Sequence, residues 1–199
     1  MQVNFFKTVN MLKYKLLARH RKGFSVHSPF VFELLNNVFF EKEHYYCYNK
    51  IEKIVAENTH NFLFFNKLKY YKLIFRLANY FNAQKILVVG KNSFIEKIFA
   101  FVSSKTQIFN IENVENVRGK DFDLIFFSEN YIKNYEKHKF SFKDNSILIF
   151  ENIYQNRKIN DVWKQIINDN NLKISIDIFS FGIIINKNEI PKQHYRVAF

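Results

Sequence analysis

The chain has 199 residues, of which 48% are hydrophobic, and this predicts one globular domain with a substantial core. Cys47 is the only cysteine, which excludes a disulfide framework or a cysteine-rich zinc site within one chain. The net charge is +12, residues 1–22 carry no apolar signal-peptide core, and no apolar run approaches the roughly 20 residues that span a bilayer. We therefore expect a cytoplasmic protein without a membrane span.

The positive charge has two explanations, and the sequence leaves both open. An anionic partner such as RNA, DNA or a membrane surface would account for it. The codon usage of an AT-rich genome would also account for it, because Phe, Ile, Asn, Lys and Tyr are abundant together. Only 6 of the 30 basic residues are arginine, the residue suited to bidentate phosphate contacts. If a partner exists, we expect it at the basic residues between 13 and 22.

The N-terminal part of the chain, residues 1–82, is predicted to be a helical extension. Its first helix spans residues 5–21 and has one apolar stripe at i, i+4, i+7 and i+11, formed by Phe5, Val9, Leu12 and Leu16. Ser28 and Pro29 are typical of a helix cap and first turn. Further helices are expected at residues 48–56 and 67–81.

From residue 84 the pattern changes to alternating strands and helices. Short apolar runs, typical of parallel strands covered on both faces, predict strands at residues 86–89, 107–111, 122–127 and 146–150. Helices are expected at residues 93–102 and 161–168. Two last strands, residues 172–179 and 182–186, are close enough to form an antiparallel hairpin. Residues 83–199 therefore predict an α/β domain with a doubly wound, Rossmann-like sheet and one reversed edge region.

The most informative segment is residues 85–94, which combine a buried strand, a single glycine at Gly90 and the start of a helix. Backbone N–H groups at such a turn face a nucleotide-bearing cofactor in Rossmann-like domains. The order of elements around this turn resembles class I S-adenosylmethionine-dependent methyltransferases, in particular a small bacterial group with a helical N-terminal extension. The resemblance covers most of the chain. Its anchors include residues 26–32, 44–46 and 73–81, of which the first is distinctive and the later ones are generic for the fold.

The resemblance implies a sheet with an antiparallel terminal strand and methyl transfer from S-adenosylmethionine to a small acceptor. The family's first motif has an acid two positions before its first glycine and a second glycine four positions after it, where this chain has Val88 and Phe94. Residues 111–122 are too few for the family's helix, strand and helix, so part of one half-sheet is expected to be missing. Ser128 stands where the family has an aspartate.

Four residues are the candidate site. The resemblance implies that Gly90 approaches the cofactor and that Glu112 accepts hydrogen bonds from its ribose hydroxyls. It also implies that Glu151 and Asn152 face the acceptor, because catechol-type O-methyltransferases hold Mg²⁺ with an Asp-Asn pair at this place. No metal site is expected here, since Ser128 would supply only a neutral hydroxyl. A solvated Glu112 and a helix-capping Asn152 are the alternative interpretations.

Two functions are compatible with these observations. The first is a methyltransferase-family protein whose cofactor motif is degenerate, with S-adenosylmethionine binding that is lost or weaker than about 100 μM. The second is a non-catalytic basic module that binds RNA, a ribonucleoprotein or another protein through its N-terminal helix. The sequence leaves the oligomeric state open.

Overall fold

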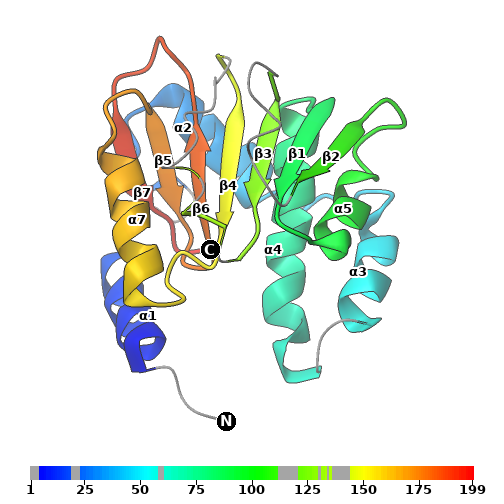
Figure 1. Ribbon diagram of the computed structural model, residues 1–199. Helices are drawn as coiled ribbons and strands as arrows, with labels where there is room; N and C mark the ends of the chain where they lie inside the picture. Colours follow the sequence, from blue (N-terminus) through cyan, green and yellow to red (C-terminus); the bar gives the residue numbers. More distant parts are fainter. Residues whose placement is uncertain are drawn as a thin grey trace.

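The computed structural model describes residues 5–18, 23–57, 61–111, 121–129, 131–133, 135 and 144–199. A seven-stranded sheet lies between two layers of helices, as Figure 1 shows. The strands are β1 (Lys85–Val89), β2 (Gln107–Ile111), β3 (Leu124–Phe127), β4 (Ile147–Glu151), β5 (Ile174–Asp177), β6 (Phe181–Ile185) and β7 (Gln193–Arg196).

The strand order is β2-β1-β3-β4-β6-β5-β7. β1 pairs in parallel with β2 and β3, and β3 pairs in parallel with β4. β6 is inserted between β4 and β5 and runs antiparallel to both. The predicted α/β, Rossmann-like fold with an antiparallel strand pair is therefore confirmed, although the reversed strand β6 lies within the sheet and not at its edge.

Within the described residues, β2 and β7 form the two edges of the sheet. β2 is the edge strand beside β1 within the part of the chain that the structure describes, and residues 112–120 lie outside it. At the other edge, β7 pairs in parallel with β5. This strand was not predicted, because its sequence, Gln-His-Tyr-Arg, has no apolar run. The expected loss of part of one half-sheet falls on residues 112–120, outside the described residues.

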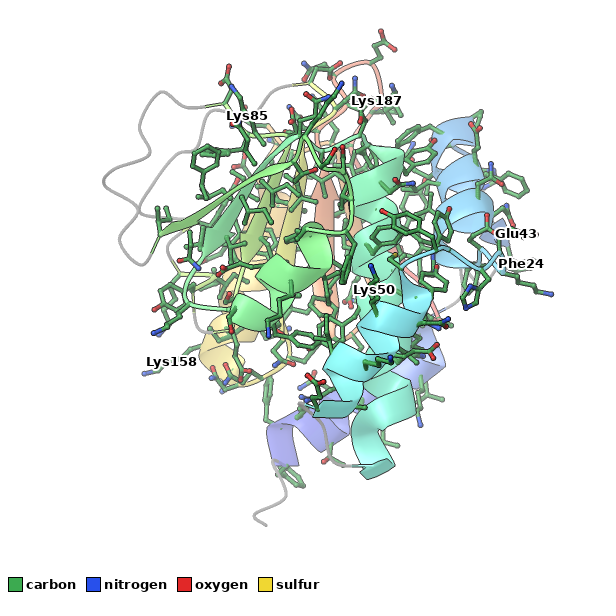
Figure 2. All side chains as sticks on the ribbon, turned by 90° about the vertical axis from the view of Figure 1, so that its right-hand side faces the viewer. Phe24, Glu43, Lys50, Lys85, Lys158 and Lys187 are labelled. Carbon is green, nitrogen blue, oxygen red and sulfur yellow. The ribbon has the colours of Figure 1, made fainter. Side chains whose placement is uncertain are left out.

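Alternate residues of the central strands point to opposite faces, as the pleat requires. Ile86 and Val88 of β1 pack against one helical layer, whereas Leu87 and Val89 pack against the other. The first layer contains α2 (Pro29–Leu34), its π-helical continuation η2 (Leu35–Phe39), α3 (Tyr48–Glu57), α4 (Asn61–Tyr80) and α5 (Ser93–Phe99). The second contains α1 (Phe5–Leu17) and α7 (Arg157–Asn168). Figure 2 shows side chains between the sheet and the first helical layer.

The helices of the N-terminal part are fixed by caps and by one buried cation. Ser28 caps α2, its hydroxyl accepting from the Val31 N–H at 3.4 Å, and Pro29 follows at the first helical position. Arg76 of α4 is 6% exposed and donates to the carbonyls of Val38 and Phe39 and to the Tyr48 hydroxyl at 2.6, 3.0 and 2.8 Å. These bonds attach α4 to the end of η2 and to α3.

The described helices contribute many of the buried hydrophobic residues that pack on this sheet. None of these helices has an apolar stretch long enough to cross a bilayer.

Candidate functional site

The carboxyl ends of β1, β3 and β4 meet at one edge of the sheet. The pairing places Val89 beside Phe127 and Phe127 beside Phe150, so Gly90, Glu129 and Glu151 follow or end neighbouring strands. Ligands of open α/β sheets bind at this edge. A cavity of about 800 Å³ lies here, bounded by α1, α4, the strand ends and the C-terminal residues. In Figure 1 α1 and α4 extend below this edge.

Two glutamates form the polar floor of the cavity. The backbone N–H of Glu129 donates to Oε2 of Glu151 at 3.0 Å. Asn152 donates from Nδ2 to Oε2 of Glu129 at 2.8 Å, and Gln155 donates from Nε2 to Oε1 of the same carboxylate. Glu129 and Glu151 are thereby held side by side, with Asn152 as a positioning group for the first.

Asn152 can take this place because the backbone turns sharply at the end of β4. Its φ is +54°, in the left-handed region that Asn tolerates better than most residues. Its N–H donates to the carbonyl of Ser180 at 2.8 Å, and its own carbonyl accepts from the N–H of Gln155 at 2.9 Å. The turn directs the side chains of Asn152 and Gln155 toward the same carboxylate.

Burial raises the pKa of Glu151 from its ordinary value of 4.5 to about 7. The neighbouring carboxylate of Glu129 adds to this shift, whereas the Glu129 N–H and the Lys67 ammonium oppose it. Burial, together with the two carboxylates, also raises the pKa of the Tyr71 hydroxyl. Glu151 is therefore an acid that exchanges its proton near neutral pH, the property required of a general acid or base.

Basic and aromatic side chains form the walls. The aromatic residues are Tyr14, Tyr70, Tyr71, Phe179, Phe181 and Phe199, and the lysines are Lys7, Lys15, Lys67 and Lys69. A cavity with an acidic floor, lysines around it and aromatic walls suits a small polar molecule with an apolar body. Across the described part of the chain, no three His, Cys, Asp or Glu side chains gather as a metal-binding group.

Gly90 does not line this cavity. Its φ is +91°, as a tight strand-to-helix turn requires, but its open side is covered by the ring of Tyr131. A Cβ atom placed on Gly90 would lie 2.4 Å from Cδ2 of Tyr131. The space that a glycine leaves for close approach is thus filled by a side chain of the same protein.

The helix after this turn is closed in a similar way. Asn92 caps α5 by accepting from the N–H of Ile95 at 3.1 Å. Phe94, at the position of the family's second glycine, lies edge-on to Tyr71 of α4, with 4.4 Å between the ring centroids. Two aromatic contacts, Tyr131 on Gly90 and Phe94 on Tyr71, therefore occupy the surroundings of the turn.

The predicted site residues separate into three groups. Glu151 and Asn152 come together at the cavity. Gly90 lies beside Tyr131 and away from the cavity lining, and Glu112 lies outside the described residues. Sequence reasoning did not identify Tyr131, Tyr71 or Lys67, because nothing in the local pattern marks a residue that reaches the site from another element.

No family model and no curated protein matches the sequence. Solved structures do match the fold. A methyltransferase from Geobacter sulfurreducens aligns over 74% of this chain and 91% of its own, with 15% identity and a TM-score of 0.51. Podospora anserina methyltransferase PaMTH1, solved with S-adenosylhomocysteine bound, aligns over 94% and 98%, with 10% identity and a TM-score of 0.51.

A third match is the O-methyltransferase TomG from Streptomyces achromogenes, solved with S-adenosylmethionine. It aligns over 94% of this chain and 100% of its own, with 9% identity and a TM-score of 0.50. The chain therefore has the fold of class I S-adenosylmethionine-dependent methyltransferases. Identities at this level establish the fold and leave the activity to be argued from the site.

Proposed function

We propose that this protein is a degenerate methyltransferase that has lost tight S-adenosylmethionine binding and acts as a non-catalytic binding protein. The observation that carries the proposal is the contact between Tyr131 and Gly90. Cofactors of Rossmann-like folds approach the backbone at this glycine turn, which must stay uncovered. The residues present do not fit that mode of binding, since an aromatic ring covers the glycine and Phe94 replaces the second one.

The cavity at the strand ends would remain as the ligand site of such a protein. Glu151 and Asn152 are the residues we assign to contact with a bound small molecule. Support for this comes from their position in the cavity and from the pKa of Glu151 near 7, which lets it accept or donate a hydrogen bond at neutral pH. Gly90 has no role in this assignment.

Calorimetric titration of the purified chain with S-adenosylmethionine tests the proposal. We expect a dissociation constant weaker than about 100 μM, equivalent to roughly −5.5 kcal/mol. Micromolar affinity would overturn the proposal and support an active methyltransferase, with Glu151 as the acid or base at the acceptor.

Whether the Tyr131 ring is what weakens cofactor binding is tested separately with Tyr131→Ala, which uncovers Gly90. We expect affinity to improve at least tenfold, while Phe109→Ala, a truncation of an exposed aromatic ring on edge strand β2, leaves it unchanged. No improvement in Tyr131→Ala would show that the ring is not what excludes the cofactor.

The second candidate is a basic module that binds RNA or a ribonucleoprotein. It is supported by the six basic residues within the first 22, of which Arg19, Arg21 and Lys22 lie outside the described part. Single-strand RNA binding must weaken with salt, with a slope of about −0.7 per phosphate contacted. Lys13→Gln/Lys15→Gln should then flatten the slope by about 1.4. An unchanged slope would remove this helix from the RNA surface.

A further inference from the structure

The first helix exposes its apolar stripe to solvent. Of the residues that form it, Phe5, Leu12 and Leu16 are 79, 60 and 80% exposed, and Val9 is half-buried. Tyr14 is the only residue of α1 that is buried. The amphipathic pattern that would ordinarily attach a helix to its own core therefore points away from it.

Helical geometry shows that the stripe and the cavity lie on opposite sides of α1. The helix and the residue that follows it contribute Lys7, Met11, Tyr14, Lys15 and Ala18 to the cavity, a set spaced at i, i+4, i+7, i+8 and i+11. With 3.6 residues per turn, successive residues are about 100° apart, and the stripe formed by Phe5, Val9, Leu12 and Leu16 centres about 150° from the cavity-facing set. The stripe is thus free of the site described above, and an inference from it does not depend on the proposed function.

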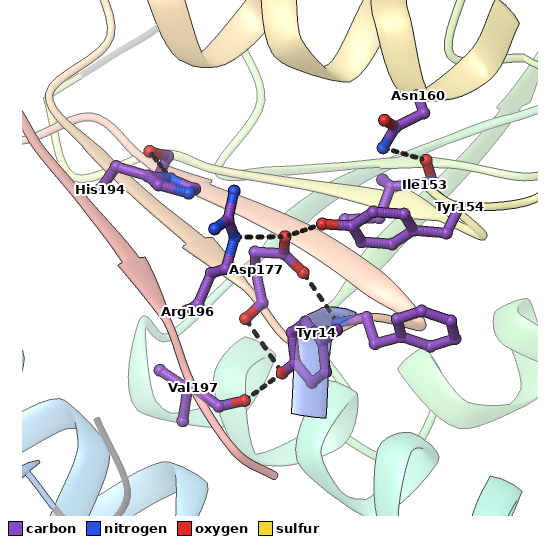
Figure 3. Close-up of polar contacts among 10 residues, drawn as sticks. Tyr14, Ile153, Tyr154, Asn160, Asp177, His194, Arg196 and Val197 are labelled. Atoms are coloured by element: carbon purple, nitrogen blue, oxygen red, sulfur yellow. Dashed lines mark hydrogen bonds and ion pairs between the residues drawn. The ribbon is translucent and has the colours of Figure 1, made fainter. Parts of the chain in front are cut away.

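Tyr14, away from the stripe, attaches the helix to the rest of the protein through polar and ring contacts. The Tyr14 hydroxyl donates to the carbonyl of Val197 and lies 3.3 Å from that of Asp177, as Figure 3 shows. The Asp177 carboxylate is fixed in turn by the Tyr154 hydroxyl at 2.6 Å and by Arg196 at 3.7 Å. Because α1 is attached through Tyr14, its stripe remains available to a partner.

The charge of this region identifies the chemistry of that partner. The sequence has no Asp or Glu before Glu33, and its first 22 residues carry six Lys or Arg residues, half of the net charge of +12. Three of the six lie on α1. Lys13 and Lys15 are at its flanks, about 70° and 90° from the centre of the stripe, whereas Lys7 is on the cavity side. A helix with a Phe and Leu face, lysines and no acid has the composition of helices that lie in the plane of a membrane interface.

We propose that α1 adsorbs onto an anionic phospholipid bilayer. Phe5, Leu12 and Leu16 enter the boundary between headgroups and acyl chains, while Lys13 and Lys15 at the flanks of the helix contact acidic headgroups. Lipid fits better than RNA, because leucines on an exposed face contribute nothing to phosphate contacts or base stacking. Lipid also fits better than a second copy of the chain, since self-association through this face would bring Lys13 and Lys15 of two helices together without any acidic residue on α1.

Vesicle co-sedimentation of the full chain tests the proposal. Vesicles of phosphatidylcholine with about one-third phosphatidylglycerol should bind the protein, with affinity falling at high salt, and pure phosphatidylcholine should bind it weakly. Leu12→Gln/Leu16→Gln should lower the partition coefficient at least tenfold. The matched control is Phe24→Gln. Phe24, labelled in Figure 2, lies outside α1 and is 71% exposed.

A fluorescent variant supplies an independent measurement of insertion. Trp163 is the only tryptophan and is 2% exposed, so it adds a constant, buried background. In the Leu12→Trp variant, the fluorescence of the new tryptophan should shift to the blue and gain intensity when anionic vesicles are added. If its emission does not shift, the stripe does not enter the bilayer.

Three other results would overturn the proposal. If the Leu12→Gln/Leu16→Gln variant binds vesicles as well as the wild type, the α1 stripe does not mediate vesicle binding. Tight RNA binding without vesicle binding would make the basic surface a nucleic-acid site. A dimer that Leu12→Gln/Leu16→Gln dissociates, in the absence of vesicle binding, would make the stripe an interface between copies.

Discussion

Replacing Glu151 with Gln should make the protein more stable above neutral pH and leave its stability unchanged near pH 4.5. The folded protein holds the Glu151 proton more tightly than the unfolded chain, because the pKa is about 7 instead of 4.5. Between these values the native state binds more protons, so the stability of the wild type falls as pH rises. Gln removes the ionisation and keeps a carbonyl oxygen that accepts from the Glu129 N–H.

The size of the effect follows from the two pKa values. At about 1.4 kcal/mol for each pH unit that separates them, ionising Glu151 in the folded protein costs up to about 3 kcal/mol. The difference in unfolding free energy between Glu151→Gln and the wild type should therefore grow from near zero at pH 4.5 to this value above pH 7.

Urea unfolding of both proteins at half-unit intervals between pH 4.5 and 8 measures the difference. Glu189→Gln is the control, because it makes the same chemical change at an exposed position, and it should stay within about 0.5 kcal/mol of the wild type throughout. A constant difference across the pH range, or a Glu151→Gln variant that is less stable at pH 8, would refute the assignment of this burial cost to Glu151.

Two further predictions concern packing. Gly182→Ala should destabilise the protein by about 1–3 kcal/mol, because a Cβ atom at this position would lie 2.6 Å from the ring of Trp163. The destabilisation should be smaller in a Trp163→Leu background, and equal destabilisation in both backgrounds would contradict the steric argument. Arg76→Met should lower the unfolding free energy by about 3 kcal/mol or more in denaturant unfolding, because it removes the donors to two backbone carbonyls and one hydroxyl. Arg76→Lys should restore only part of the lost stability, since an ammonium lacks the planar fork of the guanidinium. Full restoration would show that the positive charge alone is needed.

Much of the fold is determined by local sequence. The all-apolar runs at 86–89, 122–127 and 146–150 became buried parallel strands, because a run without polar residues is stable only when both faces are covered. The close spacing of the last two predicted strands was sufficient to predict the antiparallel pair β5 and β6. Ser28 and Pro29 began a helix as expected, since capping depends on neighbours in sequence. The turn at Gly90 was also predictable, because a glycine between a strand and a helix indicates a backbone conformation that other residues rarely adopt.

Tertiary structure decided what local sequence could not. Whether Gly90 stays open depends on Tyr131, a residue 41 positions away that reaches the turn from the segment after β3. The grouping of Glu129, Glu151 and Asn152 depends on strand order. β7 forms because β5 offers an unpaired edge, which a polar segment can use through its backbone alone. The stripe on α1 has the same spacing whether it is buried or exposed. Periodicity gives the face of a helix, and only the packing of distant segments determines what that face meets.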